Sequence, residues 1–235
     1  MKFANTLALL LVAVLFSNTA FADKPTMAVL DFRNQTSAYW WGSNVGRELG
    51  GMLTNELASG KKFRMIEREK LASVLGEQDL AASGRVSGSK AAKMGKMVGA
   101  QYLVTATVSA FESNVNSTGG GISYKGVSLG GKRKKAYIAV DLRVVDSTTG
   151  EIVDTRTVEA RSGGMGMSIG LSRNGFGGAL ANEKKTPAGK AIRAVVAEIS
   201  GYLECSMVTK GRCLDKYEEK ERKRRESLSE GIDLD

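Results

Sequence analysis

Short apolar runs that alternate with helical patterns constrain the fold of this chain more than any other feature. The run "TMAVLDF", from Thr26 to Phe32, has the length of a buried strand and stops at a polar loop. After that loop, apolar residues recur at helical spacing, namely Val45, Leu49, Met52, Leu53 and Leu57. A strand, a loop and a helix in this order predict an α/β domain.

The same alternation continues along the chain. Helical patterns occupy "EREKLASVLGEQDL", the stretch from Ser89 to about Met97, and the stretch that begins at Pro187. Strand-like runs occupy "FRMI", "AQYLVTATVSAF", "AYIAVDLRVVD" and "EIVDTRTVEA". The last two flank a Thr-Thr-Gly turn at 148–150 and are predicted to pair as a hairpin. The predicted fold is a single α/β domain whose mixed sheet is flanked by helices.

The first 22 residues have the organisation of a secretory signal peptide. Lys2 precedes an apolar run from Leu7 to Phe16, and Ala20-Phe21-Ala22 follows the small-x-small pattern of a cleavage site. The run is too short for a comfortable bilayer span, which needs about 20 residues, and no later stretch reaches that length. We therefore expect a mature protein that starts at Asp23 outside the cytoplasm.

The absence of histidine narrows the possible functions. Without it the chain lacks the usual general base near neutral pH and the commonest metal ligand. We expect no catalytic residues, no metal site and no cofactor, and therefore no enzyme. The mature chain has 33 basic and 25 acidic residues, and such a surplus suits anionic surfaces, polyanions or acidic client segments, or serves solubility. Nucleic-acid binding is disfavoured, since no face interleaves aromatic and basic residues.

Two cysteines, Cys205 and Cys213, lie near the end of the last helical pattern. In an oxidising compartment a disulfide between them is favoured over two free thiols. Residues 206–235 form a charged C-terminal tail in which acidic and basic residues alternate at spacings of three and four. This spacing predicts a solvated helix, and the alternative is a docking helix for an acidic partner.

Two glycine-rich insertions interrupt the pattern, at about 113–135 and 161–184. In the second, large apolar residues alternate with small ones on both sides of an Asn174-Gly175 turn, and these are Met165, Met167, Ile169, Leu171, Phe176 and Leu180. One apolar face and one bare face suit a hairpin of a transmembrane barrel. An arm that packs on a neighbouring subunit and a flexible glycine loop are the alternatives.

The stretch "AYWWGSN" places Tyr39, Trp40 and Trp41 side by side just before the first predicted helix. Neighbouring positions cannot face the same side of a strand or helix, so one buried core would not take both tryptophans. At least one of these rings therefore needs another explanation than core packing.

Four stretches in order resemble the CsgG family, which is named after the outer-membrane secretion channel for curli subunits. They are "AVLDF", "FRMIEREKLASVLGEQ", "GAQYLVTATVSAFESNV" and "IAVDLRVVDSTTGEIV", and the resemblance spans roughly residues 26–205. It implies a periplasmic domain at 23–205 that forms a ring of identical subunits. Each subunit would add two hairpins, at the two insertions, to one β-barrel pore.

The resemblance also implies an aromatic constriction inside the ring. Counted back from "MLTNEL", its aromatic position falls on Trp41, with Trp40 and Tyr39 beside it. The alternative is that Trp41 stacks on the first helix while Trp40 and Tyr39 cover a subunit interface.

Three departures from the family pattern bear on function. No cysteine follows the signal peptide, where the namesake carries its lipid; the second hairpin is shorter and far richer in glycine; and the tryptophan pair replaces an asparagine-phenylalanine pair. We expect a passive component of curli-type assembly at or in the outer membrane. Its partners would be other copies of itself, an exported fibre or adhesin subunit and other envelope assembly proteins. The alternative is a soluble periplasmic ring or adaptor without a pore.

Overall fold

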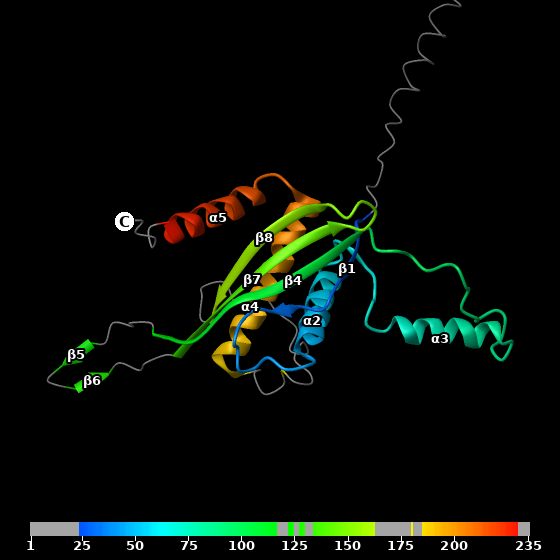
Figure 1. Cartoon of the computed structure of the whole chain (residues 1–235), viewed down its shortest axis with the longest axis horizontal. Coiled ribbons are helices and arrows are strands. Elements are labelled where there is room, and N and C mark those ends of the chain that lie inside the picture. Colours follow the sequence, from blue (N-terminus) through cyan, green and yellow to red (C-terminus); the bar gives the residue numbers. More distant parts are fainter. Residues whose placement is uncertain are drawn as a thin grey trace, which may run out of the picture.

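The structure, a computed structural model, describes residues 24–116, 122–124, 127–129, 134–162, 180 and 185–229. The predicted signal peptide at 1–22 lies outside this part of the chain. A six-stranded sheet forms the centre of the domain (Figure 1). Its strands are β1 (Thr26–Val29), β2 (Arg33–Asn34), β3 (Arg64–Met65), β4 (Tyr102–Asn116), β7 (Lys134–Asp146) and β8 (Ile152–Arg161).

The sheet is mixed, as the sequence predicts. Its strand order is β3-β1-β4-β7-β8, and β2 also pairs with β4. The pairs β1 with β3, β1 with β4 and β2 with β4 are parallel, whereas β4 with β7 and β7 with β8 are antiparallel. The predicted β7–β8 hairpin is confirmed, and Gly150 takes the left-handed backbone that its turn requires, with φ of 76°.

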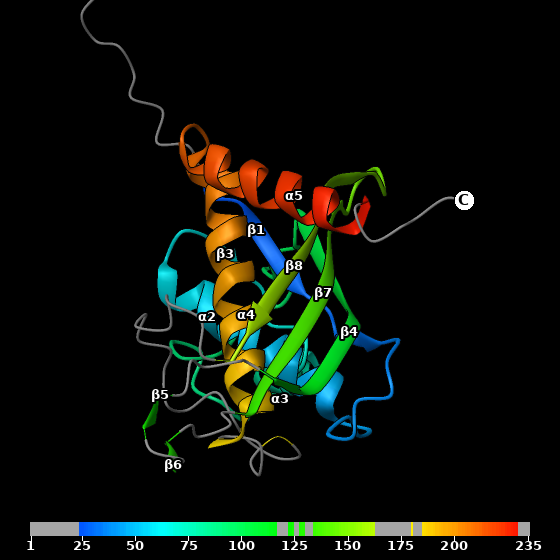
Figure 2. The same ribbon diagram turned by 90° about the vertical axis from the view of Figure 1, so that its left-hand side faces the viewer.

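Two helices cover one face of this sheet. Helices α2 (Val45–Gly60) and α4 (Pro187–Leu203) pack against each other and against the central strands (Figure 2). Alternate residues of β4 and β7 are buried beneath them, as a strand with one covered face requires, and these are Val104, Ala106, Val108, Ile138, Val140, Leu142 and Val144. Thr186 caps α4 by accepting the Gly189 N–H at 3.0 Å, and Pro187 follows it.

The other face of the sheet is polar. Thr105 and Thr107 of β4 are half-buried there, and Arg143 of β7 is exposed. The Thr157 hydroxyl donates to an Asp141 carboxylate oxygen at 2.8 Å across the β7–β8 pair. The hydrophobic core of the domain therefore lies on the helix side of the sheet.

Strands β4 and β7 extend into the first predicted insertion. Their pairing continues to Asn116 and Lys134, and β5 (Ile122–Tyr124) pairs with β6 (Val127–Leu129) beyond them. Most of the predicted membrane hairpin of the second insertion, Met165, Met167, Ile169, Leu171 and Phe176, lies outside the described residues.

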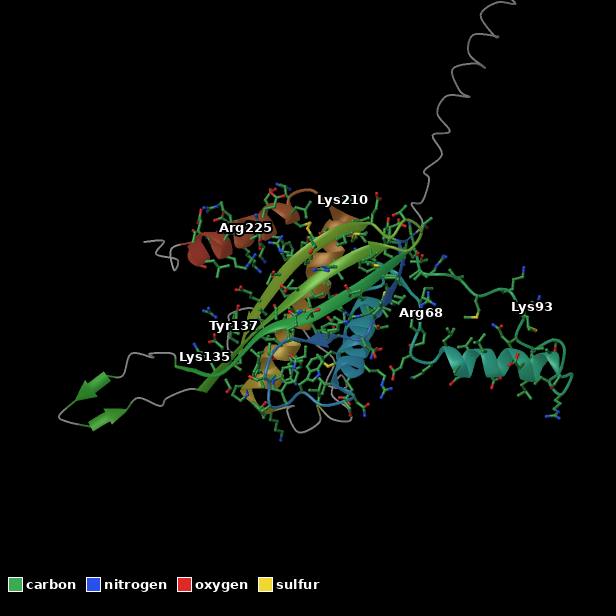
Figure 3. All side chains as sticks on the ribbon, in the orientation of Figure 1. Arg68, Lys93, Lys135, Tyr137, Lys210 and Arg225 are labelled. Atoms are coloured by element: carbon green, nitrogen blue, oxygen red, sulfur yellow. A yellow bond between two sulfur atoms is a disulfide. The ribbon has the colours of Figure 1, made fainter. Side chains whose placement is uncertain are left out.

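Helix α3 (Leu71–Ala82) projects from the body with its flanking segments, and we call residues 67–99 the α3 arm (Figure 1). Arg68 and Lys93 belong to this arm (Figure 3). The helix predicted from Ser89 to Met97 is wrong, because that stretch forms turns and extended chain. Gly95 takes a left-handed backbone there, with φ of 70°, and the side chain of Met94 is exposed.

A close approach between α2 and the segment after β1 fixes the first half of the domain. The Phe32 N–H donates to the Gly46 carbonyl at 2.9 Å. A Cβ atom on Gly46 would lie 2.3 Å from the Phe32 carbonyl oxygen, which is closer than atoms can pack. Only glycine lets the two backbones meet at this point.

We predict that Gly46→Ala lowers the free energy of unfolding by about 1–3 kcal/mol more than Gly60→Ala does, because the new methyl group overpacks the contact with Phe32. Gly60 is a matched control, since it belongs to the same helix and nothing lies within 4 Å of its added Cβ. Urea denaturation of both variants measures the difference. Equal stability of the two variants would contradict this role of Gly46.

Candidate functional site

The aromatic loop, which we define as Tyr39, Trp40 and Trp41, is held by short-range hydrogen bonds. Asn34 accepts the Thr36 backbone N–H at 2.9 Å, and the Thr36 hydroxyl in turn accepts the Ala38 N–H at 3.2 Å. The Trp41 N–H then donates to the Ala38 carbonyl at 3.0 Å. These bonds give a loop without regular secondary structure a defined path from β2 to α2.

The three rings of this loop point in different directions. Trp40 is only 6% exposed and meets Phe111 of β4 edge-on, with ring centroids 5.3 Å apart. Trp41 is half-buried and packs against α2 beside Gly46. Tyr39 is 65% exposed and has its ring 6.0 Å from that of Phe111. Each aromatic pair contributes roughly 0.5–1.5 kcal/mol beyond the area it buries.

The prediction that Trp40 lines a constriction needs correction. Its ring belongs to the hydrophobic core, and its indole nitrogen is buried without a hydrogen-bond partner among the described residues. Burial of an unpaired N–H costs about 1–3 kcal/mol, and the packing of the ring offsets that cost. Trp41 stacks on the first helix, as the alternative interpretation expected. Tyr39 is the member of the loop that is mainly exposed.

The aromatic loop lies where both insertions leave the domain. Phe111, which both Tyr39 and Trp40 contact, stands just before the first insertion. At that end of the sheet Ser113 pairs with Ala136, and the Ser162 N–H donates to the Ala136 carbonyl at 2.8 Å. The two insertions therefore start at one end of the same sheet.

Leu180, at the end of the second insertion, is fully buried in the core. Its backbone N–H donates to a Glu48 carboxylate oxygen at 3.0 Å, in the first turn of α2. This corrects the prediction that Leu180 faces lipid. The apolar alternation along the sequence continues to Leu180, but the core of the domain takes up that last position.

A second unusual feature is the C-terminal helix α5 (Cys213–Ser229). Helix α4 continues into a π-helix, η3 (Glu204–Thr209), and the chain then turns at Lys210 and Gly211, which have φ of 53° and 78° (Figure 3). Cys205 and Cys213 form a disulfide across this turn. The bond ties the start of α5 to the end of α4, and α5 then lies along β8 (Figures 1 and 2).

Tyr217 anchors α5 to the domain. Its ring lies 5.2 Å from that of Tyr202 on α4, and the Arg156 guanidinium of β8 lies over both rings, at 4.8 Å from Tyr202 and 5.5 Å from Tyr217. The Tyr202 hydroxyl donates to Asp154 at 2.6 Å. Burial raises the pKa of Tyr202 and of Tyr217 to about 12. Both phenols therefore stay neutral at any physiological pH.

Helix α5 carries a network of ion pairs between residues three and four positions apart, from its exposed face to the side that turns toward β8. Arg222 pairs with Glu219 at 2.8 Å, and Arg224 pairs with Glu221 at 2.8 Å. Hydrogen bonds from Arg222 and Arg224 lower the pKa of Glu219 and of Glu221 to about 2. The prediction of a solvated helix is correct for the exposed face and wrong for the face of Tyr217. The signal in the sequence for this buried contact is Tyr217, a single aromatic residue between charged ones.

Within the described ranges, no three histidine, cysteine, aspartate or glutamate side chains gather closely enough to hold a metal ion. No helix in the same ranges has both the length and the apolar character that a membrane crossing requires. The fold and the site define a class, namely α/β domains with helices on one face of a mixed sheet and two insertions at one end.

The chain belongs to the CsgG family. The family model described as "Curli production assembly/transport component CsgG" matches residues 12–232. CsgG proteins of Escherichia coli K12 and Salmonella typhimurium LT2 are each 31% identical to it over 115 residues. That match spans 47% of this chain and 42% of each relative, so the chain matches less than half the length of these curated relatives.

Solved structures that match this chain share little sequence with it. The hypothetical protein CT253 of Chlamydia trachomatis is 18% identical, with a TM-score of 0.42 over 77% of this chain and 98% of that one. The PelC dodecamer of Paraburkholderia phytofirmans is 14% identical, with a TM-score of 0.37 over 74% and 85%.

We predict that loss of the disulfide releases α5 while the sheet stays folded. A loop as short as the one between Cys205 and Cys213, eight positions apart, is worth about 2–3 kcal/mol when it is closed. Hydrogen exchange of a Cys205→Ser/Cys213→Ser variant should accelerate in α5 and stay unchanged in β4. A reductant should accelerate the exchange of α5 in the natural protein and cause no further change in the variant. Slow exchange of α5 in both the reduced natural protein and the variant would contradict the prediction.

Proposed function

We propose that the protein is a passive, oligomeric secretion or assembly component at the outer membrane, which exports or tethers fibre or adhesin subunits without a cofactor. The observation that carries this proposal is the position of the aromatic loop in a CsgG family member. The loop sits where two insertions leave one end of the sheet, and Phe111 links it to the first of them. In a ring of copies, barrel wall and constriction would then start from one end of each domain.

The constriction would be formed by Tyr39, with Trp41 behind it. Tyr39 is largely exposed, and its edge contact with Phe111 ties its ring to the body of the sheet. One such ring from each copy would narrow an axial opening with flat, amphipathic surfaces. Selection would be steric, because an unfolded segment passes such an opening and a folded domain does not.

Assembly into a ring is supported by the α3 arm. Within the arm, Val74 and Leu75 are 41% and 44% exposed, and they flank Gln78, the buried residue of the helix, on one side of it. A 12-residue helix is marginal by itself in water, so it gains its stability from packing. We propose that a second copy covers this apolar surface. Such a one-way contact, repeated around an axis, closes a ring.

A soluble periplasmic ring or adaptor is the second candidate function. The observation that favours it is the burial of Leu180, which removes one apolar position from the proposed membrane hairpin. In this case the insertions would serve as arms that bind other envelope proteins. The protein would scaffold an assembly without forming a pore.

We predict that Leu75→Glu breaks the oligomer, because a charge at the covered surface of the α3 arm would be desolvated without a partner. Ser73→Glu is the matched control, since Ser73 is exposed and lies on the opposite side of the same helix. Sedimentation velocity of the mature protein should give a large species for the control and a monomer for Leu75→Glu. The same oligomer in both variants would rule out the arm as the contact.

We predict that Tyr39→Ala raises the conductance of the reconstituted protein in planar bilayers, whereas Tyr39→Phe, which keeps the ring, does not. The preceding measurement is fractionation of cells with high-salt and carbonate washes, followed by native electrophoresis. Retention of a large oligomer in the outer membrane is expected. Release of an intact oligomer into the soluble fraction would argue against the pore and for the adaptor.

A further inference from the structure

Strand β8 forms one edge of the sheet. It pairs with β7 on one side only, and the strand order ends with it. In an edge strand every second residue turns its N–H and C=O groups away from the sheet, where they can pair with another chain. In the described part of the chain no backbone hydrogen bond joins Ile152–Arg161 to α5. The free edge of β8 thus faces α5 without pairing to it.

A groove separates β8 from α5. Its volume is about 390 Å³, which falls within the range of ligand-binding pockets. Arg156 and Arg161 line it from β8, and Tyr217, Lys220 and Arg224 line it from α5. A helix that only shielded the edge would fill this space with its own side chains. Here the disulfide and Tyr217 hold α5 beside the edge and leave room between them.

The groove has an excess of positive charge. Five basic side chains line it against three acidic ones, so the lining favours an anionic occupant, and the acidic ones are Glu159, Glu198 and Glu221. Two of these carboxylates are already neutralised, because Glu198 pairs with Lys220 and Glu221 pairs with Arg224. Lys223 pairs with Glu219 outside the lining, so Glu159 is the acidic lining residue that remains against Arg156 and Arg161.

Arg156 and Arg161 supply this remaining charge. Within the described residues neither guanidinium forms an ion pair with a carboxylate; Arg156 lies over Tyr202 and Tyr217, and Arg161 lies 5.5 Å from the ring centre of Tyr137. Stacking on an aromatic ring fixes the plane of a guanidinium but leaves its N–H groups able to donate. Both arginines are thus oriented on the free strand and prepared to bind carboxylates.

We propose that the groove between β8 and α5 binds an extended acidic segment of another protein by strand addition. The main chain of the segment would pair with the free edge of β8, and its carboxylates would bind Arg156 and Arg161. Arg156 and Arg161 lie five residues apart on β8, so their side chains leave opposite faces of the strand and would bind two carboxylates five positions apart, on opposite sides of the segment. This binding site lies apart from the aromatic loop and requires neither a pore nor a ring.

The first experiment measures binding of a fluorescein-labelled peptide of eight residues that carries two glutamates five positions apart and valine at the other positions. Fluorescence anisotropy with the full mature protein should show saturable binding that weakens as salt screens the charges. The same peptide with lysine in place of glutamate should not bind. A peptide N-methylated at every second residue, which cannot complete a ladder, should bind at least about tenfold more weakly. Absence of binding, or equal binding of the lysine peptide, would overturn the proposal.

Variants locate the site. Arg161→Gln and Arg156→Gln should each weaken the affinity about tenfold, because each removes a charge-assisted hydrogen bond. Arg222→Gln is the matched control: Arg222 lies on α5 but pairs with Glu219 and Glu226 away from the groove, and its loss should leave affinity unchanged. Arg161 makes no contact with Tyr217, so its variant keeps the anchor of α5. A loss of affinity with Arg222→Gln equal to that of the groove variants would contradict the assignment.

Hydrogen exchange identifies the mode of binding. Peptide should slow the exchange of amides in β8 and leave those of β4 unchanged, since β4 is already paired on both sides. Binding without protection of β8 would rule out strand addition. Protection of β8 that grows with protein concentration in the absence of peptide would mean that a second copy occupies the edge, which would also overturn the proposal.

Discussion

The contact between Phe32 and Gly46 is the constraint on which the rest of the domain depends. From Val29 to Arg33 the chain advances four residues while its partner β4 advances three, from Val104 to Thr107. The extra residue lets Phe32 leave the strand and reach the backbone of α2. Helix and sheet are thereby locked together, and the chain after β2 is delivered to the point where β4 passes into the first insertion.

The regular elements could be read from the sequence because each has its own apolar period. Strand-like runs on both sides of a Thr-Thr-Gly turn identified β7 and β8, and helical spacing identified α2 and α4. The failures share one cause, which is that periodicity does not reveal what covers an apolar face. The stretch from Ser89 to Met97 was predicted as a helix, but its Met94 and Met97 side chains are exposed, and Leu180 continued a lipid-facing pattern into the core. The burial of Trp40 could not be predicted, because its packing partner Phe111 is distant in the sequence.

The resemblance to the CsgG family drew attention to the aromatic loop, but it did not indicate where α5 packs. The two tryptophans can be neighbours in the sequence because Trp40 packs in the core and Trp41 packs on α2. The preceding Tyr39 stays on the surface. Tyr217 illustrates the opposite case, since one aromatic residue redirects a charged helix from solvent to the edge of the sheet. Separate regions of the domain therefore serve two purposes: one end of the sheet carries the insertions, and one edge carries the helix.

The disulfide between Cys205 and Cys213 also links the order of maturation to the compartment. Such a bond forms in oxidising surroundings, so α5 would be secured only once the chain reaches such a compartment. Before that moment the sheet would be complete, but the edge of β8 would lack its outer wall. A copy in reducing surroundings would thus lack the outer wall of the groove that we propose binds acidic segments.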